Sequence, residues 1–376
     1  MAPADIVRPT HVEVNLSCLE RNFTAIRQHV GSAKVMPVLK ANAYGHGLVE
    51  VARLMVGLGA DYLGAAFLEE GLLLRQAGIT APVLVLGSLA GEQIPRFIQN
   101  DLTLTASSID KLQLIDEAAA ALKLRAKVHL KVDTGMERVG IHHYSAPKLL
   151  EASLLCRHLE VEGIYSHFAN ADAADLSHAR LQLERFLDVL AFYERHSLPV
   201  PMRHIANSAG VLQLPESHLD LVRPGIMLYG VYPSSECQRT VSVEPALQWK
   251  SQVCYFKVVQ PGSPVSYGST WQSDHPVRIV TVPVGYGDGY FRALSNQAQV
   301  LIRGQRYPIV GRVCMDQFMV NIEWDSAYNG DVVTLLGRDG NETITADDLA
   351  RWAGTIPYEV LTNINTRVPR VYMRDQ

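Results

Sequence analysis

Eight short apolar runs alternate with longer segments of helical periodicity between residues 35 and 222 of the chain. A strand-like run that is followed by a helix-like segment is typical of parallel β-strands joined by crossover helices. Eight such units within about 200 residues predict a (β/α)8 barrel of the TIM type. The runs that we expect to form strands are residues 35–39, 62–66, 83–86, 102–105, 126–132, 159–165, 203–205 and 219–222.

The intervening segments carry apolar residues at helical spacing. Helices are expected at residues 48–58, 69–76, 92–99, 108–122, 146–156 and 173–196. An earlier helix is expected to begin at a capping box formed by Ser17 and Glu20 and to end at Gly31. An open doubly wound sheet is the alternative fold, although its G-x-G-x-x-G signature and the P-loop motif are both missing from the sequence.

The pattern changes near residue 245, where β-branched and aromatic stretches are separated by Pro and Gly. Strands are expected at residues 251–259, 278–284, 300–302, 318–322 and 332–335, and one helix at 345–352 with Thr345 as its N-cap. The fold class is therefore α/β, with a barrel over residues 12–240 and a mainly β domain over residues 241–376. Residues 233–245 are the expected linker, and residues 1–11 are candidates to pack with the second domain.

The composition excludes several classes of protein. The chain has 376 residues and a net charge of −4. A nucleic-acid-binding protein usually carries an excess of basic residues, which this chain lacks. No apolar run reaches the roughly 18 residues of a membrane span, and the N-terminus shows no secretory signal. The five cysteines are scattered without a C-x-x-C pair, which argues against zinc ribbons and disulfide frameworks. We expect a cytoplasmic protein with no membrane or nucleic-acid partner and no metal site.

Polar residues follow five of the predicted barrel strands. Active sites of such barrels lie at the carboxyl ends of the strands, so these residues form a candidate site. They are Lys40, Asn42 and Tyr44 after the first strand; Lys131, Asp133 and Arg138 after the fifth; Ser166, His167 and Asn170 after the sixth; Asn207, Ser208 and Gly210 after the seventh; and Arg223, Pro224 and Gly225 after the eighth.

Lys40 is the most informative of these residues. It ends an apolar strand, where poor solvation lowers the pKa of an amine, and a neutral amine can form a Schiff base with an aldehyde cofactor. The alternative is a lysine that extends into solvent at the barrel rim. The loops 207–210 and 223–226 could bind a phosphate through backbone N–H groups, although such loops are common. His167 taken alone is compatible with a hydrogen-bonded core histidine.

Nine segments, spread in order over nearly the whole chain, form a recognisable set. They are VLKANAYGHG (38–47), KVDTGMERVG (131–140), EGIYSHFA (162–169), HIANSA (204–209), VRPGIMLYG (222–230), VSYG (265–268), PVGYGDGY (283–290), RVCMDQ (312–317) and IPYE (356–359). Together these segments resemble the alanine racemase family. Two positions depart from the family pattern. Glu137 stands where a small or amide residue is expected, and Gly287 where Ala is more usual.

The resemblance implies a pyridoxal 5'-phosphate enzyme that interconverts L- and D-alanine with two bases, in a head-to-tail homodimer with shared active sites. Lys40 would hold the cofactor and act on one face of the α-carbon, and Tyr267 of the other subunit would act on the opposite face. The ordinary Tyr pKa of about 10 is high for a base at neutral pH, and a cationic network of His167, Arg223 and His204 could lower it.

The remaining site residues are also assigned by resemblance. Arg223 would face the pyridine nitrogen, and Arg138 would lie near the cofactor phenolic oxygen and the substrate carboxylate. Lys131 is a lysine that the family can carry as a carbamate paired with Arg138. The residues expected at the cofactor phosphate are Tyr44, Asn207, Ser208, Gly225, Ile226 and Tyr358. The residues expected from the partner subunit at the substrate are Tyr286, Met315 and Asp316.

Other functions remain open at this point. The expected role is D-alanine supply for peptidoglycan, with a serine or broad-specificity racemase on the same fold as the alternative. A non-catalytic cofactor carrier would lack residues 245–376. A basic amino-acid decarboxylase would carry an acidic residue in place of Arg223.

Overall fold

The computed structural model describes residues 8–375, and the chain divides into two compact units. The barrel unit comprises residues 20–43 and 48–244. The β unit comprises, among the described residues, 8–19, 44–47 and 245–375. The short segment 44–47 thus belongs to the β unit, although it lies within the predicted barrel. The predicted boundary between residues 240 and 241 stays a prediction.

Eight parallel strands form the barrel unit, as the alternation of runs predicted. They are β2 (Lys34–Val35), β3 (Leu63–Ala65), β4 (Val83–Val85), β5 (Leu104–Ala106), β6 (Ala126–Asp133), β8 (Leu159–Tyr165), β9 (Met202–His204) and β10 (Leu221–Val222). The strands β5, β6, β8 and β9 pair in sequence, β3 pairs with β4, and the last strand β10 pairs with the first, β2. A short strand β7 (Ile141–His142) also pairs with β6.

Single bridges complete the ring between these sheets. Val38 bridges to Gly64, and Leu84 bridges to Thr103. Asp220 donates its backbone N–H to the Arg203 carbonyl across 3.1 Å, which joins β10 to β9. The first strand is shorter than predicted because Pro37 has no N–H to donate to a ladder. The regular strand therefore ends at Val35, although Met36 and Val38 still donate backbone hydrogen bonds to the Val222 and Pro224 carbonyls.

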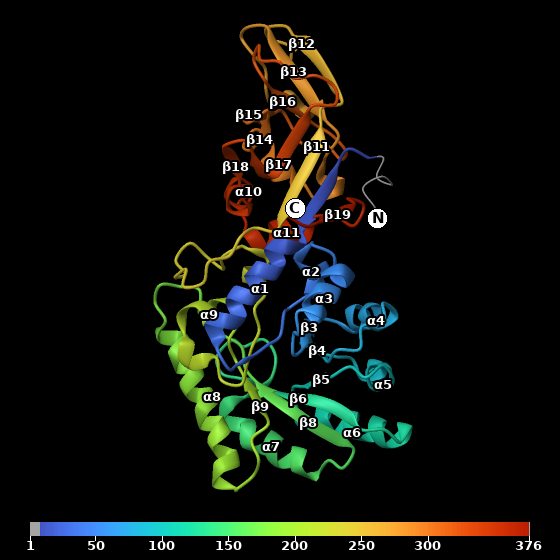
Figure 1. The fold of residues 1–376 in the computed structure, drawn as a ribbon, viewed down its shortest axis with the longest axis vertical. Helices are drawn as coiled ribbons and strands as arrows, with labels where there is room; N and C mark the ends of the chain where they lie inside the picture. Colours follow the sequence, from blue (N-terminus) through green and yellow to red (C-terminus); the bar gives the residue numbers. More distant parts are fainter. Residues whose placement is uncertain (1–7, 376) are drawn as a thin grey trace. The chain divides into compact units, whose positions relative to one another are not determined.

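Helices cover the outside of the barrel, and Figure 1 shows α4, α5 and α6 on the outer side of strands β3 to β6. The helices are α1 (Leu16–Val30), α3 (Leu48–Gly57), α4 (Leu68–Gln76), α5 (Ile94–Gln99), α6 (Ile109–Leu122), α7 (Ala146–Leu155), α8 (Ser177–Arg195) and α9 (Ser208–Gln213). Helix α1 ends before Gly31 as predicted, but its predicted cap at Ser17 is wrong. The Asn15 side chain accepts hydrogen bonds from the Ser17 and Cys18 N–H groups, because Ser17 already lies inside the helix.

The β unit is built on a ten-stranded sheet. Its main path runs β12–β13–β16–β15–β14–β17–β11–β1–β19, with β18 paired to β17. The strands are β1 (His11–Asn15), β11 (Leu247–Gln252), β12 (Tyr255–Val259), β13 (Val277–Val282), β14 (Gln299–Ile302), β15 (Gln305–Val310), β16 (Phe318–Asn321), β17 (Val332–Asp339), β18 (Glu342–Ile344) and β19 (Arg370–Met373). Residues 1–11 were expected to pack with this unit. Of these, residues 1–7 lie outside the described residues, and His11 begins β1.

Aromatic side chains form part of the core of the β unit. Tyr290 stacks on Phe318 with ring centroids 5.2 Å apart, and Trp249 meets Tyr290 edge to face at 5.6 Å. Helix α10 (Ala346–Ala353) begins at the predicted N-cap, Thr345, whose side chain accepts a hydrogen bond from the Asp348 N–H. Helix α11 (Pro357–Asn363) was not predicted. Within residues 8–375, no helix is both long and apolar enough to cross a membrane.

Candidate active site

Lys40 begins a left-handed turn at the end of the first barrel strand. The next four residues, 41–44, all have φ between 52° and 56°, a conformation that costs a non-glycine residue roughly 1–2 kcal/mol. Side chains hold the turn in place: Glu70 accepts the Ala41 N–H at 2.7 Å, and Asn42 accepts the Leu48 N–H at 2.9 Å. Strain that surrounding contacts maintain in this way is common at functional sites.

A cavity of about 260 Å³ opens beside Lys40 in the barrel unit. Four of the predicted site residues line it, namely Lys40, Lys131, Arg138 and His167. Burial lowers the pKa of Lys40, and the positive charge of Arg138 lowers it further. The Arg138 guanidinium forms no hydrogen bond or ion pair with any residue in 8–375, so its donors are available to an anion. The cavity therefore combines an amine biased towards its neutral form with an unpaired guanidinium.

Lys131 is buried at the wall of this cavity. Burial lowers its pKa to about 7, with a further contribution from Arg223. Its Nζ donates to the Val132 carbonyl at 3.2 Å and lies 4.9 Å from the centre of the Tyr165 ring. The structure contains no direct ion pair between Lys131 and a carboxylate among the described residues. At neutral pH, a substantial fraction of Lys131 therefore carries the neutral amine.

Arg223 lies fully inside the barrel and is held by neutral acceptors. Its Nη2 donates to the Ser166 and Ile205 carbonyls at 2.7 and 2.9 Å, and to His167 Nδ1 at 3.1 Å. Its Nη1 donates to His204 Nδ1 at 2.8 Å. No carboxylate within residues 8–375 pairs with it, and burial lowers its pKa to about 10. Arg223 thus stays protonated at neutral pH and is fixed in one orientation.

The arginine determines where the protons of His129, His167 and His204 lie. Because a guanidinium only donates, Nδ1 of both His167 and His204 must accept, and their protons are on Nε2. His204 Nε2 then donates to His129 Nδ1 at 2.8 Å, so the His129 proton is also on Nε2. Burial, followed by the charge of Arg223, lowers the pKa of each ring. The histidines are neutral, and the positive charge of this network resides on Arg223.

Sequence reasoning missed two residues of this network, His129 and Tyr165. Tyr165 stacks on His204 with ring centroids 4.8 Å apart, and its hydroxyl lies 2.8 Å from the Thr105 hydroxyl. It also lines the cavity beside Lys40. A signal existed for each of them. His129 is a polar residue in an apolar strand, and Tyr165 ends a predicted strand next to Ser166.

The two predicted phosphate loops meet in the barrel unit. Ser208 begins α9, and its hydroxyl accepts the Gly225 N–H at 2.8 Å. Gly225 directly precedes a one-turn 3-10 helix, η5 (Ile226–Tyr229). The Asn207 side chain caps α9 by accepting the Gly210 N–H at 3.0 Å. The Asn207 side chain therefore stabilises the start of α9. Ser208 lies at the start of α9, and Gly225 and Ile226 lie at the start of η5, so their hydroxyl and backbone N–H groups are close together.

The other predicted site residues lie in the β unit. Tyr44 and Tyr358 are neighbours there, with ring centroids 6.2 Å apart. Burial raises the pKa of Tyr44 well above its usual value, so its hydroxyl keeps its proton. Gly45 has φ of +82°, and a side chain at that position would collide with the Leu361 carbonyl of α11. This close approach explains why a glycine follows Tyr44.

Tyr267 is the most accessible of the predicted catalytic residues, with 73% of its surface exposed. It begins a one-turn helix, η6 (Tyr267–Ser269), after Ser266, which has φ of +68°. The Ser266 hydroxyl donates to the Arg312 carbonyl at 2.7 Å and so anchors the turn. The Tyr267 hydroxyl has no partner among the described residues. The β unit therefore presents this phenol on its own surface.

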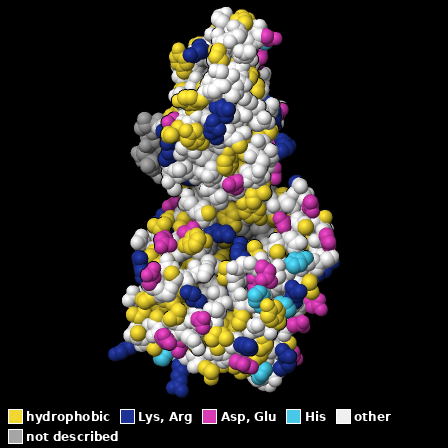
Figure 2. Space-filling view, turned by 180° about the vertical axis from the view of Figure 1, so that it is seen from behind, with side chains coloured by type: hydrophobic (Ala, Val, Ile, Leu, Met, Phe, Trp, Pro, Cys, Tyr) yellow, Lys and Arg dark blue, Asp and Glu magenta, His cyan; other side chains and the backbone are white. Residues whose placement is uncertain are grey.

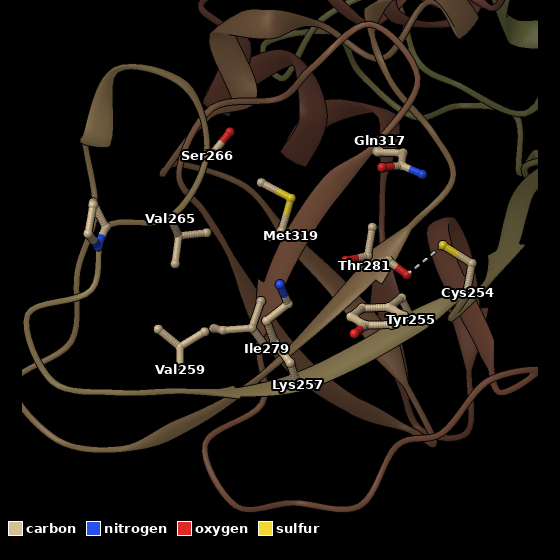
Figure 3. Close-up of a pocket in the computed structure, with 11 residues that line it drawn as sticks. Cys254, Tyr255, Lys257, Val259, Val265, Ser266, Ile279, Thr281, Gln317 and Met319 are labelled. Carbon is tan, nitrogen blue, oxygen red and sulfur yellow. Dashed lines mark hydrogen bonds between the residues drawn. The ribbon is translucent and has the colours of Figure 1, made fainter.

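A cavity of about 620 Å³ lies beside this turn within the β unit (Figure 3). Val259, Val265, Ile279 and Met319 gather on one side of it, whereas Cys254, Thr281 and Gln317 lie on the other. Two rim residues are chain neighbours of predicted site residues, because Ser266 precedes Tyr267 and Gln317 follows Asp316. The cavity therefore adjoins the surface that the β unit is expected to offer to a partner.

Tyr286, Met315 and Asp316 are brought together by direct backbone pairing. Tyr286 starts a one-turn helix, η7 (Tyr286–Asp288), and its N–H donates to the Cys314 carbonyl at 3.0 Å. The Gly287 N–H donates to the Met315 carbonyl at 2.9 Å. The side chains of Tyr286, Met315 and Asp316 are all substantially exposed.

No group of three or more His, Cys, Asp or Glu side chains in the described part of the chain could hold a metal ion.

Comparisons with known proteins agree with this arrangement. The family model for the alanine racemase N-terminal domain matches residues 14–233, and the model for the C-terminal domain matches residues 246–372. An alanine racemase of Carboxydothermus hydrogenoformans is 47% identical over 98% of this chain and 100% of its own length. The alanine racemase structure from Clostridium difficile 630 is 38% identical, with a TM-score of 0.93 over 99% of this chain and 97% of that chain. An alanine racemase structure from Bartonella henselae with covalently bound pyridoxal phosphate is 28% identical, with a TM-score of 0.88 over 97% of this chain and 99% of that chain.

Proposed function

Because the chain belongs to the alanine racemase family over both of its units, we propose that it interconverts L- and D-alanine with pyridoxal 5'-phosphate as cofactor. The observation that carries the proposal is the cavity beside Lys40. There the barrel holds together an amine of lowered pKa at Lys40, the Arg138 guanidinium and the buried Arg223, and neither arginine pairs with a carboxylate among residues 8–375.

The residues of the barrel unit fit this cofactor. Lys40 can bind its aldehyde through a neutral amine, Arg223 can donate to its pyridine nitrogen, and Ser208 with the 225–226 backbone can bind its phosphate. Tyr44 and Tyr358 are proposed to add hydroxyl donors to the phosphate. When bound, the cofactor supplies an electron sink for the negative charge that develops at the substrate α-carbon.

Proton transfer is proposed to involve Lys40 on one face of the α-carbon and Tyr267 on the other. Lys40 suits the role of a base because burial biases it towards the unprotonated amine. Because His167 and His204 are neutral, the positive charge that would favour a Tyr267 phenolate comes from Arg223 and Arg138. Arg223 keeps its own proton near neutral pH, so it would donate a hydrogen bond to the cofactor ring without giving up the proton. Arg138 is proposed to bind the substrate carboxylate.

The partner subunit is proposed to complete each site, which requires a homodimer. Support comes from the side chains of Tyr267, Tyr286 and Met315, which the β unit leaves exposed and which a partner subunit could cover. Tyr286, Met315 and Asp316 are proposed to form the partner's share of the substrate site, with the bulky Tyr286 and Met315 beside the substrate methyl group.

A cytoplasmic location with a role in D-alanine supply for peptidoglycan is also proposed. Cys156, Cys237, Cys254 and Cys314 are not in disulfide bonds, which suits a reducing compartment. Acidic and basic side chains are interspersed over the face drawn in Figure 2, an arrangement unlike the basic stripe of a nucleic-acid-binding protein.

The decisive experiment on the function is side-by-side turnover of L-alanine, L-serine and L-lysine by the purified protein. We expect alanine to have the highest kcat/KM, because Tyr286 and Met315 are bulky groups suited to a methyl side chain. Equal turnover of serine would favour the broad-specificity alternative. Release of carbon dioxide from lysine would instead favour a decarboxylase, and no turnover at all would favour a carrier protein.

Lys131 is expected to carry a carbamate. Carbon dioxide reacts with a neutral amine, and burial lowers the pKa of Lys131 to about 7. Protein equilibrated with carbon-13-labelled bicarbonate should show a carbamate NMR signal that disappears in Lys131→Met. Lys127 is the matched control on the same strand, because its ion pair with Asp101 raises its pKa and keeps it charged. A signal that survives in Lys131→Met, or that is lost in Lys127→Met, would contradict the assignment.

A further inference from the structure

Asp288 is a completely buried carboxylate of the β unit that the proposed reaction does not use. Arg8 donates to both of its oxygens, at 2.7 and 2.8 Å, and Arg367 Nε donates to Oδ1 at 2.6 Å. The Gly285 N–H donates to Oδ2 at 3.0 Å. Burial alone would raise the pKa of Asp288, but the hydrogen bonds from Arg8, Arg367 and the Gly285 N–H, together with the charge of Arg8, lower it. Asp288 is therefore a charged anchor for two arginines.

The two arginines differ in what else they reach. Arg367 Nη2 also donates to Asp316 Oδ1 at 2.6 Å, whereas Arg8 makes its further bond to the Pro283 carbonyl. The Asp316 side chain is 62% exposed, and the Asp288 side chain is not exposed at all. Arg367 thus connects a buried carboxylate to an exposed one, and only the exposed one belongs to the proposed substrate surface.

The same cluster determines the position of Tyr286. Tyr286 and Asp288 are the two ends of η7, and the η7 backbone pairs with the Cys314 and Met315 carbonyls. Arg367 therefore holds both sides of this pair of loops: the η7 side through Asp288 and the Met315 side through Asp316. Loss of Arg367 would leave the two backbone bonds as the direct links between the loops that carry Tyr286 and Asp316.

Gly287 provides the space that this bridge requires. A Cβ atom at Gly287 would lie 2.9 Å from Arg367 Nη1 and 3.1 Å from the Met315 carbonyl oxygen. Its φ is not in the left-handed region, so the backbone conformation itself does not demand glycine.

We propose that Arg367 is a positioning residue that fixes Asp316 and Tyr286 at the substrate side of the active site, and that Gly287 makes room for it. The proposal rests on the proposed function, in which Tyr286 and Asp316 border the substrate. The positive charge of Arg367 compensates the negative charge of the Asp316 carboxylate, and the hydrogen bond between them holds Asp316 in one orientation. An unpaired Asp316 carboxylate would move freely and would repel the carboxylate of the amino-acid substrate.

The first test measures loop order and does not depend on catalysis. Amide hydrogen exchange is followed by mass spectrometry in the full-length protein for peptides that cover residues 284–290 and 312–317. Arg367→Met should accelerate exchange in both peptides, since the Tyr286 and Gly287 amides lose their support. Arg8→Met is the matched control, because it removes an equally direct ion pair to Asp288 but none to Asp316. Gly287→Ala should resemble Arg367→Met more closely than Arg8→Met.

The second test measures alanine racemisation by the same variants. Arg367→Met should raise KM about ten-fold with little change in kcat, because it disturbs binding rather than the proton-transfer groups. Arg8→Met should leave KM within about two-fold of wild type. In the double variant Arg367→Met/Asp316→Asn, KM should fall part of the way back to the wild-type value, because the unpaired negative charge of Asp316 is then removed. Thermal unfolding of each variant identifies those that fail to fold.

The outcomes separate this proposal from the proposed function. Equal effects of Arg8→Met and Arg367→Met on exchange and KM would show that the cluster is a general structural clamp, and would overturn the proposal. Unchanged exchange in Arg367→Met and Gly287→Ala would also overturn it. If the wild-type protein does not racemise alanine, the proposed function fails, while the exchange experiment still decides whether Arg367 orders the two loops.

Discussion

Lys40→Ala is expected to reduce alanine racemisation by at least about 10⁴-fold, because it removes both the covalent attachment point of the cofactor and one of two acid–base groups. Borohydride treatment of the wild-type protein with pyridoxal phosphate should fix the cofactor to the chain. The label should map to the peptide that contains Lys40 and should be lost in the variant. The physical basis is the lowered pKa of this amine inside the barrel cavity.

Lys34→Ala is the matched control for this experiment. Lys34 lies on the same short strand, β2, but its side chain is exposed and outside the cavity. The control variant should keep wild-type labelling and rate. Covalent fixation at any other lysine, or full activity in Lys40→Ala, would show that the cavity is not the cofactor site.

Tyr267→Ala is expected to abolish racemisation as well, but with unequal losses in the two directions. A two-base mechanism needs a separate group on each face of the α-carbon, and Lys40 remains intact in this variant. In deuterated water, Lys40 should still exchange the α-proton of D-alanine, whereas exchange from L-alanine should be lost. Tyr255→Ala is the matched control, because Tyr255 is another exposed tyrosine of the β unit. Equal residual exchange from both enantiomers would contradict the assignment.

Mixing the two inactive variants tests whether Tyr267 serves a partner subunit. A heterodimer of Lys40→Ala and Tyr267→Ala subunits would contain one site with both bases and one with neither. A random mixture should therefore recover about one quarter of the wild-type activity, since half of the dimers are heterodimers with one working site. Distinct affinity tags on the two variants verify the exchange. Verified heterodimers that remain inactive would show that Tyr267 acts within its own subunit or is not the second base.

Local pattern was sufficient to predict much of the architecture. All eight barrel strands have counterparts near the predicted positions, because alternation of short apolar runs and amphipathic segments is a local property. The errors also have local causes. Pro37 shortens the first strand, and Asn15 competes with Ser17 for the cap of α1. The strand predicted at residues 251–259 is two strands, β11 and β12, and the elements β1, β7, β15, β18, β19 and α11 were not predicted.

The candidate site was predictable only in part. Lys40, Arg138 and His167 follow predicted strands and Lys131 lies near the end of one, and parallel strands of one barrel bring such residues to the same rim. His129 could have been noticed as a polar residue within an apolar strand. Its contact with His204 could not, because the pairing of side chains across the barrel interior depends on strand register.

The sequence by itself determined the residue types available for chemistry and their order along the chain. These include the lysine at the end of the first strand and the family motifs that surround it. Tertiary structure decided the properties of those residues. Burial brings the pKa of Lys131 to about 7, Arg223 is hydrogen-bonded to backbone carbonyls and neutral histidines, and Arg367 joins Asp288 to Asp316 across 79 and 51 residues of chain. The physical reason is that desolvation and charge pairing depend on distances in space, which residues remote in the sequence acquire only when the chain has folded.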